Sequence, residues 1–303
     1  MDKFDVLIIG MGPAGLTAAL YAQRYNLKTL VLGKSFGQTG DAVWIENYPG
    51  IKSISGAEFI NQLINQVTEL GVKIEFEEVT ELKKEKNYFI AKTPSSEFIA
   101  KTVILAVGKR SKKLGAKGEK ELLGKGVSYC TTCEGAFFKG KTTAVVGGGD
   151  AALTGALMLA QHSKKVYLIH RKDIFSGEPI WQKKVMEEPK IEILFNSEIQ
   201  EFNGKEKLES VALIQKGKLK EMKIDGVFIE VGQLPNNELP KQLGIELTQN
   251  DLVKVDNEMK TNIKGAFVCG DIIDLFQLKQ IIISAATGAI AAHSAFNYLK
   301  SEL

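Results

Sequence analysis

The sequence predicts an α/β protein with two Rossmann-like dinucleotide-binding domains, the second inserted into the first. Two glycine-rich segments support this, GMGPAG at residues 10–15 and GGGDAA at residues 147–152. Each follows an apolar strand and precedes a helix, the context that separates a dinucleotide-binding turn from an ordinary strand-to-helix turn. The third observation is the pair Cys130 and Cys133, which lies between the two segments in the sequence CTTC.

The first nucleotide unit is predicted at the start of the chain. Residues 5–10 should form a buried strand, residues 13–26 a helix and residues 28–32 a second strand. The free N–H groups at the helix N-terminus suit a pyrophosphate. Gly12 would let the backbone approach the phosphates, and Gly15 would let the helix pack closely on the strand.

The same plan restarts later in the chain. Residues 142–146 read as a strand, residues 150–162 as a helix and residues 165–170 as a strand. Strand-like segments between the two units cover residues 71–77, 88–92 and 102–107, and a small-residue helix is predicted at residues 280–299.

Two polar stretches, at residues 108–126 and 232–244, have few large apolar side chains and predict hinges. We therefore expect a first domain made of residues 1–112 and 244–303, interrupted by a second domain at residues 113–243.

The end of the second strand in each unit indicates the nucleotide. Residues 32–34 (LGK) offer no acid to a ribose. In the second unit His170, Arg171 and Lys172 stand about twenty residues after the glycines, where an NAD site places Asp or Glu. Basic side chains there favour the 2′-phosphate of NADP. A solvated basic strand end is the alternative.

The two cysteines of CTTC predict a redox pair. A metal site needs about four ligands, and only Cys269 and three scattered histidines remain, so we expect no metal. A buried structural pair is the alternative. Glu134 directly follows Cys133, and its carboxyl could supply a proton to a departing thiolate; the alternative is an exposed surface acid. The next aromatic residues, Phe137 and Phe138, are either core or an anchor for a protein partner.

Composition limits the class of protein. The chain has 303 residues, is 44% hydrophobic and 25% charged, and carries a net charge of +3, which is ordinary for a globular protein and gives no nucleic-acid footprint. The apolar run at residues 6–9 is too short for a signal peptide or a membrane span. We expect a cytoplasmic protein without a membrane or nucleic-acid partner.

Taken in order, these motifs resemble the low-molecular-weight thioredoxin reductase family over essentially the whole chain. Besides the two glycine-rich turns, the resemblance rests on ENYPG at residues 46–50, SYCTTCEG at 128–135, HRKD at 170–173, VGQLPN at 231–236, CGD at 269–271 and KQ at 279–280. The CxxC inside the second nucleotide domain separates this family from larger disulfide reductases.

The resemblance implies FAD on the first domain, NADPH or NADH on the second, a homodimer, and thioredoxin or a thioredoxin-like protein as partner. It implies that Cys133 faces the flavin, that Cys130 attacks the partner's disulfide, and that the second domain rotates. The predicted FAD residues are Gly10, Gly12, Pro13, Ala14, Gly15, Gly33, Gln38, Asn47, Gly108, Asp271, Lys279 and Gln280. The predicted NAD(P)H residues are Gly147, Gly149, Asp150, Ala151, His170, Arg171 and Lys172.

Departures from the family pattern bear on the electron donor. Lys172 and Ser176 stand where the family usually has arginine, and Lys lacks the bidentate fork of Arg. Other departures are Glu134, Thr154, Gly155 and Lys279. We expect a modest preference for NADPH over NADH. Two alternatives remain: the same fold with ferredoxin or another carrier as donor, and a non-enzymatic flavin redox sensor.

Overall fold

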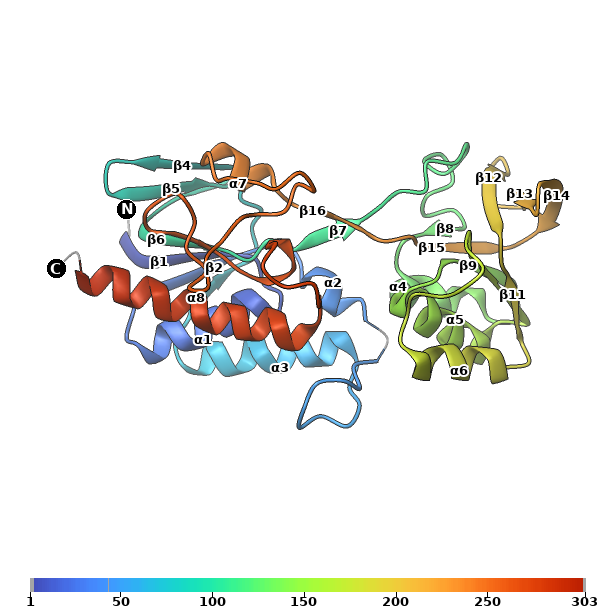
Figure 1. The fold of residues 1–303 in the computed structure, drawn as a ribbon, viewed down its shortest axis with the longest axis horizontal. Helices are drawn as coiled ribbons and strands as arrows, with labels where there is room; N and C mark the ends of the chain where they lie inside the picture. The colour runs from blue at the N-terminus through green and yellow to red at the C-terminus, as the bar shows by residue number, and fades with distance from the viewer. Residues whose placement is uncertain (1–2, 43, 302–303) are drawn as a thin grey trace. The chain divides into compact units, whose positions relative to one another are not determined.

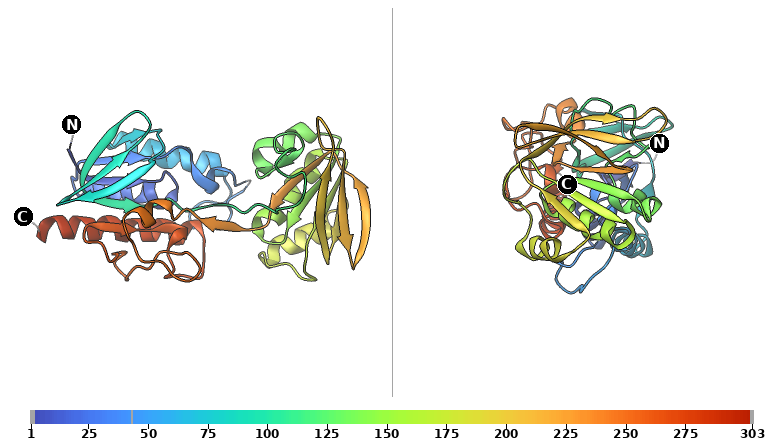
Figure 2. Two further views of the ribbon diagram at one scale, coloured as in Figure 1. Left: turned by 90° about the horizontal axis from the view of Figure 1, so that it is seen from above. Right: turned by 90° about the vertical axis from the view of Figure 1, so that its right-hand side faces the viewer.

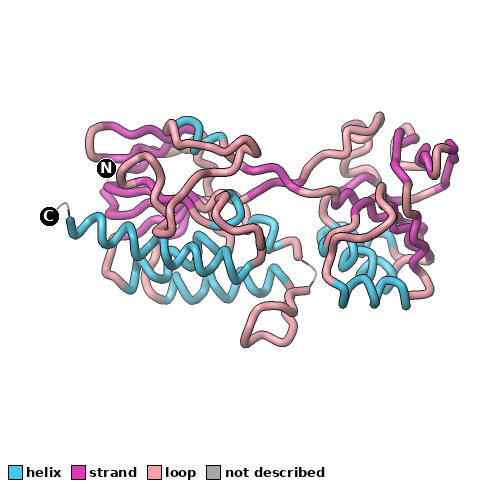
Figure 3. The backbone as a smooth tube through the Cα atoms, in the orientation of Figure 1, coloured by secondary structure: helices cyan, strands magenta, loops and turns pink. Residues whose placement is uncertain are grey.

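The computed structural model describes residues 3–42 and 44–301 and divides them into two compact units. The first unit comprises Met1–Gly40, Ile45–Arg110 and Pro235–Leu303, and the second comprises Asp41–Trp44 and Ser111–Leu234. Each unit contains both strands and helices (Figure 3).

The first unit is built on a seven-stranded sheet with a parallel centre. Its order is β3-β2-β1-β6-β5-β4, and β17 pairs with the second half of β6. The strands are β1 (Lys3–Ile9), β2 (Thr29–Leu32), β3 (Lys73–Glu75), β4 (Glu81–Glu85), β5 (Tyr88–Lys92), β6 (Glu97–Leu105) and β17 (Ala266–Val268). The central strands are apolar and largely buried, as strands covered on both faces must be.

Three long helices accompany this sheet: α1 (Pro13–Arg24), α3 (Gly56–Glu69) and α8 (Ile281–Ser301) (Figure 1). Helix α1 packs against both of the others. The approach of α8 is so close that a Cβ added to Gly288 would lie 2.1 Å from the carbonyl oxygen of Ala14. Shorter helical segments are α2 (Gly37–Gly40), α7 (Glu238–Gln242) and η2 (Gly270–Ile272).

The second unit has a five-stranded parallel sheet, in the order β11-β10-β9-β15-β8, and a three-stranded antiparallel sheet, β12-β13-β14. The parallel strands are β8 (Val127–Ser128), β9 (Thr142–Gly147), β10 (Lys165–Ile169), β11 (Ile191–Leu194) and β15 (Gly226–Glu230). The antiparallel strands are β12 (Ser197–Asn203), β13 (Ser210–Gln215) and β14 (Lys218–Lys223).

Helical segments complete the second unit: α4 (Thr131–Glu134), η1 (Gly135–Phe138), α5 (Asp150–His162) and α6 (Pro179–Glu187). One apolar cluster, which includes Phe228 and Trp181, joins the parallel sheet to α5 and α6. Another lies between the two sheets of the unit. Figure 2 shows helices packed against the sheet in each unit. The predicted fold class, two Rossmann-type α/β domains with one inserted into the other, is confirmed.

The long segment Ser111–Leu234 of the second unit begins at β7 (Lys109–Ser111) and ends at β16 (Gln233–Pro235), and these two strands pair as a two-stranded sheet. The predicted hinge at residues 108–126 is longer than β7. The buried carboxylate of Glu119 accepts N–H groups of Leu114 and Gly115 at 2.9 and 2.5 Å, which fixes the rest of that stretch within the second unit.

Sequence patterns located the elements around both glycine turns. The helix predicted at residues 13–26 is α1, and the one predicted at residues 280–299 is α8. Helix α3 and the antiparallel sheet were not predicted. For α3 a signal existed, because Ser55 accepts the Glu58 N–H at 3.2 Å as its N-cap, and serine followed three residues later by glutamate is a capping sequence. None of the helices in the described part of the chain has the length and apolar character that crossing a bilayer requires.

Candidate active site

The first glycine turn lies between β1 and α1 and is open to a ligand. Gly10 has φ +119°, and a Cβ there would lie 2.2 Å from the carbonyl oxygen of Ala106, so only glycine fits. A Cβ at Gly12 would meet nothing within 4 Å. Gly12 is the N-cap of α1 and has no side chain to cap the first N–H groups. These N–H groups lack intrahelical partners and suit a pyrophosphate.

Most other residues predicted to bind FAD lie at the same edge of the first sheet. Gly33 follows β2, Gly108 comes shortly after β6, and Asp271 comes shortly after β17. Strands β2 and β6 flank β1 in parallel, and β17 pairs in parallel with β6. Ligands of open α/β sheets bind beyond the carboxyl ends of the strands. Gln38 lies in α2, which follows β2.

Hydrogen bonds join the residues of this region to one another. Asn47 Nδ2 donates to Gln280 Oε1 at 3.1 Å, and Ser284 Oγ donates to Asp271 Oδ1 at 2.9 Å. Lys279 Nζ donates to the Ile273 carbonyl at 2.5 Å. Burial, together with the nearby charge of Lys109, lowers the pKa of Lys279. The residues of the ENYPG, CGD and KQ motifs are therefore brought to one edge.

The second glycine turn repeats this design between β9 and α5. Gly147 has φ +153°, and a Cβ there would lie 2.3 Å from the Glu230 carbonyl oxygen. Gly149 is the N-cap of α5 without a side-chain cap, and the nearest atom to a Cβ there would be Ser176 Oγ at 3.9 Å. Asp150 begins the helix, and its Oδ1 accepts the Glu178 N–H at 2.6 Å. The exposed Ala151 follows it.

The basic segment after β10 divides into two parts. His170 is buried beneath the turn: a Cβ on Gly148 would lie 2.3 Å from its ring, and its Nε2 lies 3.0 Å from the Ile174 carbonyl oxygen. Burial, with the charges of Lys172 and Arg171, lowers the pKa of His170. Arg171 and Lys172 are exposed. His170 therefore supports the turn, and the two cations remain available to an anion.

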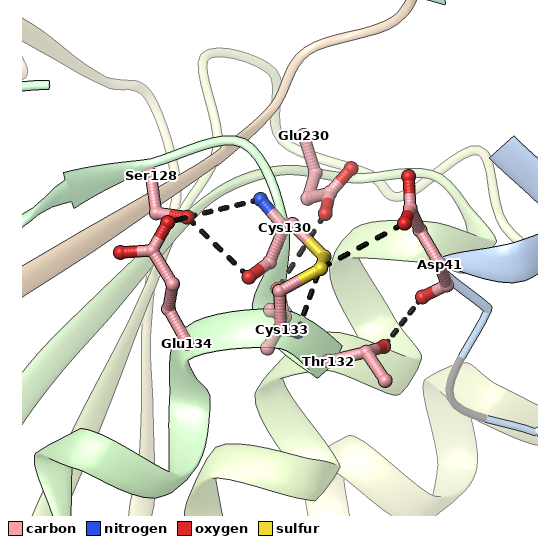
Figure 4. The surroundings of a disulfide bond; sticks show 8 residues. Asp41, Ser128, Cys130, Thr132, Cys133, Glu134 and Glu230 are labelled. Atoms are coloured by element: carbon pink, nitrogen blue, oxygen red, sulfur yellow. Dashed lines mark hydrogen bonds between the residues drawn. A yellow bond between two sulfur atoms is a disulfide. The ribbon is translucent and has the colours of Figure 1, made fainter. Parts of the chain in front are cut away.

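Cys130 and Cys133 form a disulfide with their Cα atoms 5.3 Å apart. It lies where β8 ends and α4 begins (Figure 4). Cys130 Sγ accepts the Cys133 N–H at 3.1 Å. Cys133 is exposed and Cys130 is half-buried. The remaining cysteine, Cys269, is free and fully buried in the first unit, where burial raises the pKa of its thiol to about 12.

Glu134 reaches the pair through Ser128. Ser128 Oγ lies 2.8 Å from Glu134 Oε1, accepts the Cys130 N–H at 3.0 Å and lies 3.3 Å from the Cys130 carbonyl oxygen. Within residues 3–42 and 44–301, no hydrogen bond joins Glu134 to either sulfur. A proton from Glu134 would therefore need a shift of this side chain or a relay through the serine hydroxyl.

Two carboxyl groups that the sequence reasoning missed also face the pair. Asp41 belongs to the second unit, and its Oδ1 lies 3.7 Å from Cys133 Sγ; burial raises its pKa. Its backbone carbonyl accepts the Thr132 hydroxyl. Glu230 Oε1 lies 3.5 Å from Thr131 Oγ1. Figure 4 shows Asp41, Glu134 and Glu230 around the disulfide on different sides.

These additions carried different signals. Ser128 is part of the SYCTTCEG motif and could have been included on position alone. Asp41 and Glu230 stand far from Cys130 along the chain, and no motif marks them as partners of the pair. Of the two aromatics after the pair, Phe138 packs edge-on against Phe228 in the core, with ring centroids 5.5 Å apart, and Phe137 is 81% exposed.

Comparison of the chain with known proteins identifies its family. The pyridine nucleotide-disulphide oxidoreductase family matches residues 4–292. The chain is 40% identical to the thioredoxin reductase of Bacillus subtilis (strain 168) over 98% of this chain and 95% of that protein.

Solved structures agree with this family. Thioredoxin reductase from Lactococcus lactis matches with a TM-score of 0.95 and 37% identity, covering 99% of this chain and 100% of that one. A ferredoxin-flavin thioredoxin reductase from Clostridium acetobutylicum is 33% identical, with a TM-score of 0.55, over 100% of this chain and 99% of that chain.

Proposed function

Because the chain belongs to the thioredoxin reductases of the pyridine nucleotide-disulphide oxidoreductase family, we propose that Cys130 and Cys133 are its redox-active disulfide. The enzyme is an FAD-dependent oxidoreductase of this class. Its substrate is thioredoxin or a similar small disulfide protein. The observation that carries the proposal is the Cys130–Cys133 disulfide, which lies in the same unit as an open dinucleotide turn.

The two units divide the cofactors between them. The first turn and the edge with Asn47, Asp271 and Gln280 would hold FAD, and the second turn would hold NAD(P)H. The open space over Gly12 and Gly149 fits a pyrophosphate in each. When bound, NAD(P)H supplies a hydride and FAD converts that hydride into an electron pair for a disulfide.

The cysteines then carry out thiol–disulfide exchange. Reduction of the disulfide adds two electrons and yields two thiols once both sulfurs are protonated. Cys130 attacks the partner's disulfide as a thiolate and forms a mixed disulfide, and one partner thiolate leaves. Cys133 attacks that mixed disulfide, releases the second partner thiolate and restores the Cys130–Cys133 bond. Glu134, linked to the pair by Ser128, is the proposed proton donor to a departing thiolate.

Trapping the mixed disulfide tests which cysteine attacks the partner and which one releases it. The Cys133→Ser variant should accumulate a covalent complex with thioredoxin through Cys130, and Cys130→Ser should not. Both variants should lose NAD(P)H-driven reduction of thioredoxin. If both retain full activity, the pair does not carry the electrons.

Two electron donors are considered for the second unit. The second glycine turn is intact, and Arg171 and Lys172 are exposed beside it, which supports NADPH or NADH. Similarity to a ferredoxin-flavin enzyme keeps a protein carrier as the second candidate. Anaerobic titration of the flavin-loaded protein with each nicotinamide decides. Bleaching of the flavin absorbance by NADPH or NADH supports the first, and no bleaching by either supports the carrier.

The redox sensor without turnover, the non-enzymatic alternative raised by the sequence, is not favoured, because the chain belongs to a family of reductases. It would cycle between dithiol and disulfide once and would not reduce an excess of thioredoxin. Multiple turnovers per enzyme molecule in the assay above would eliminate it.

Partner contacts, assembly and compartment complete the proposal. The exposed Phe137, four residues after Cys133, contacts the disulfide protein. Phe137→Ala should raise the KM for thioredoxin and leave reduction of a small aromatic disulfide unchanged.

The enzyme acts as a homodimer, which sedimentation at several concentrations tests. It works in the cytoplasm, where thiols are kept reduced and catalytic CxxC pairs operate.

A further inference from the structure

Glu230 is placed between the second glycine turn and the disulfide. It is the last residue of β15, and on one side it pairs with Gly147 of the turn. On the other side β15 pairs with β8 in parallel, with Phe228 opposite Ser128. Glu230 lies two residues after Phe228 at the end of β15, and Cys130 lies two residues after Ser128, just beyond the end of β8. The two residues therefore leave the sheet at the same edge.

The Glu230 carboxyl is mostly buried and has no cationic partner among residues 3–42 and 44–301. The carboxyl group accepts a hydrogen bond from the hydroxyl of Thr131. Thr131 is buried, and it directly follows Cys130 in the sequence. A Cβ added to Gly155 would lie 2.9 Å from Thr131 Oγ1, so α5 holds this hydroxyl in place. A structural carboxylate at such a site would be expected to have a cation or several N–H donors.

Burial raises the pKa of Glu230 to about 7, the Thr131 hydroxyl opposes that rise, and the negative charge of Asp41 adds to it. The titratable groups near it are Asp41 of the second unit and, when reduced, the two cysteines. All of them are neutral or negative. Each new negative charge at this site therefore opposes the others.

We propose that Glu230 controls ionisation of the Cys130 thiol, so that Glu230 and Cys130 together hold one negative charge in the reduced site. When Glu230 is ionised, the Cys130 thiolate is disfavoured by like charge. When Cys130 ionises, Glu230 takes up a proton. The two groups titrate as a coupled pair, and attack on the partner draws on the form with a thiolate and a protonated glutamate. Glu230 acts on the sulfur through its charge and is a positioning residue.

Thiol titration tests this without the nicotinamide or the partner. The inference rests on the proposed redox role of the pair, but the rate of Cys130 alkylation can be measured in either case. The experiment uses flavin-loaded protein in a Cys133→Ser background, where Cys130 cannot re-form the disulfide, and iodoacetamide at a series of pH values. The buried Cys269 thiol should not react.

Glu230→Gln should lower the midpoint pH of Cys130 alkylation by about one unit, which makes alkylation about tenfold faster below the midpoint. Glu230→Asp keeps the charge and should stay close to the parent protein. Equal midpoints for the parent protein and the Glu230→Gln variant overturn the proposal. Equal shifts in Glu230→Gln and Glu230→Asp overturn it as well, because a packing effect would not follow charge.

A second variant covers a Glu230→Gln protein that fails to bind flavin or to fold. Thr131→Val keeps the shape of the side chain and removes the hydroxyl that favours ionised Glu230. Glu230 then stays protonated to higher pH, and the Cys130 midpoint should fall, by less than in Glu230→Gln. An unchanged or raised midpoint in Thr131→Val counts against the proposal. Loss of partner reduction in both cysteine variants with no Glu230 effect would leave the proposed function standing without this inference.

Discussion

The two glycine turns share a backbone design but differ in what surrounds them. Both begin with a glycine of positive φ whose Cβ would overlap a carbonyl oxygen, and both start a helix with an uncapped glycine N-cap. The first turn is followed by Pro13 and has no acid in its first helical turn, whereas the second is followed by Asp150.

The loop after β10 accounts for the difference. Asp150 Oδ1 accepts a hydrogen bond from the Glu178 N–H. The Gly148 carbonyl oxygen accepts the N–H groups of Ser176 and Gly177 at 2.8 and 3.0 Å. The second turn is thus tied to the loop that carries its basic residues. We infer that the glycines form the phosphate sites and that the strand and loop that follow each turn select the nucleotide.

The largest expected effect comes from filling the close backbone contact that both turns share. Gly10→Ala and Gly147→Ala each combine positive φ with overlap of a carbonyl oxygen and should cost roughly 3 kcal/mol or more of unfolding free energy. Flavin release follows the first unit during urea unfolding. Tryptophan fluorescence follows the second, because Trp44 and Trp181 both lie there.

Two matched controls separate strain from overlap. Gly244 in the first unit and Gly217 in the second have φ +71° and +77° with nothing within 4 Å of an added Cβ. Their alanine variants should cost only about 1 kcal/mol. Equal losses for Gly10→Ala and Gly244→Ala would show that the close contact with Ala106 is not what fixes the glycine.

The second effect distinguishes the nucleotides bound by the two turns. Gly12→Ala and Gly149→Ala point a methyl group into open space, so folding should change by about 1 kcal/mol or less. Gly12→Ala should lose flavin on gel filtration. Gly149→Ala should keep its flavin and raise the KM for NAD(P)H about tenfold or more. The opposite pattern would exchange the cofactor assignments.

The third effect concerns the phosphate read by the second unit. One charge-assisted contact to phosphate contributes about 1.5–3 kcal/mol, or roughly tenfold or more in affinity. Lys172→Arg with Ser176→Arg should lower the KM for NADPH about tenfold and leave that for NADH almost unchanged.

Ser176 needs its own control, because its Oγ donates to the Gly148 carbonyl at 3.2 Å. Ser176→Ala removes that bond alone and reports what the double variant loses. If the KM for NADPH is the same in the double variant as in Ser176→Ala, these two positions do not contact the 2′-phosphate.

The smallest effect is a pH dependence in the first unit. Burial would raise the pKa of Asp5, but hydrogen bonds from Lys101 and from the Lys28 N–H outweigh it and lower the pKa. A lowered folded-state pKa contributes stability above the unfolded value near 4, and this is lost as pH falls through the folded value.

Asp5→Asn should therefore cost about 1 kcal/mol or less at neutral pH and nothing near pH 2. Asp225 accepts the Thr142 N–H at 2.9 Å in the second unit, so Asp225→Asn offers the matched comparison. Urea unfolding at the two pH values measures both. A cost for Asp5→Asn that persists at low pH would assign it to packing.

Local patterns predicted the turns, their flanking strands and helices, and the cysteine pair, because each is set by residues within about one βα unit. The residues that surround the cysteine pair could not be predicted from local patterns. Glu230 reaches Thr131, the residue after Cys130, because β8 and β15 pair in parallel, and a register between segments so far apart leaves no periodic trace in the sequence. His170 was expected to bind nucleotide, but its burial under Gly148 depends on how the following loop folds back.

The pairing of β7 with β16 brings together the two ends of the long segment Ser111–Leu234, which forms most of the second unit. Its chain enters after Arg110 and leaves before Pro235, and Arg110 Nη1 donates to the Pro235 carbonyl at 3.2 Å. Insertions whose ends lie together can be gained or lost without breaking the host fold. A gene in which a short glycine linker replaces residues 111–234 would encode a continuous host sheet, and such grafting offers a route by which one flavoprotein scaffold acquires different electron-carrying modules.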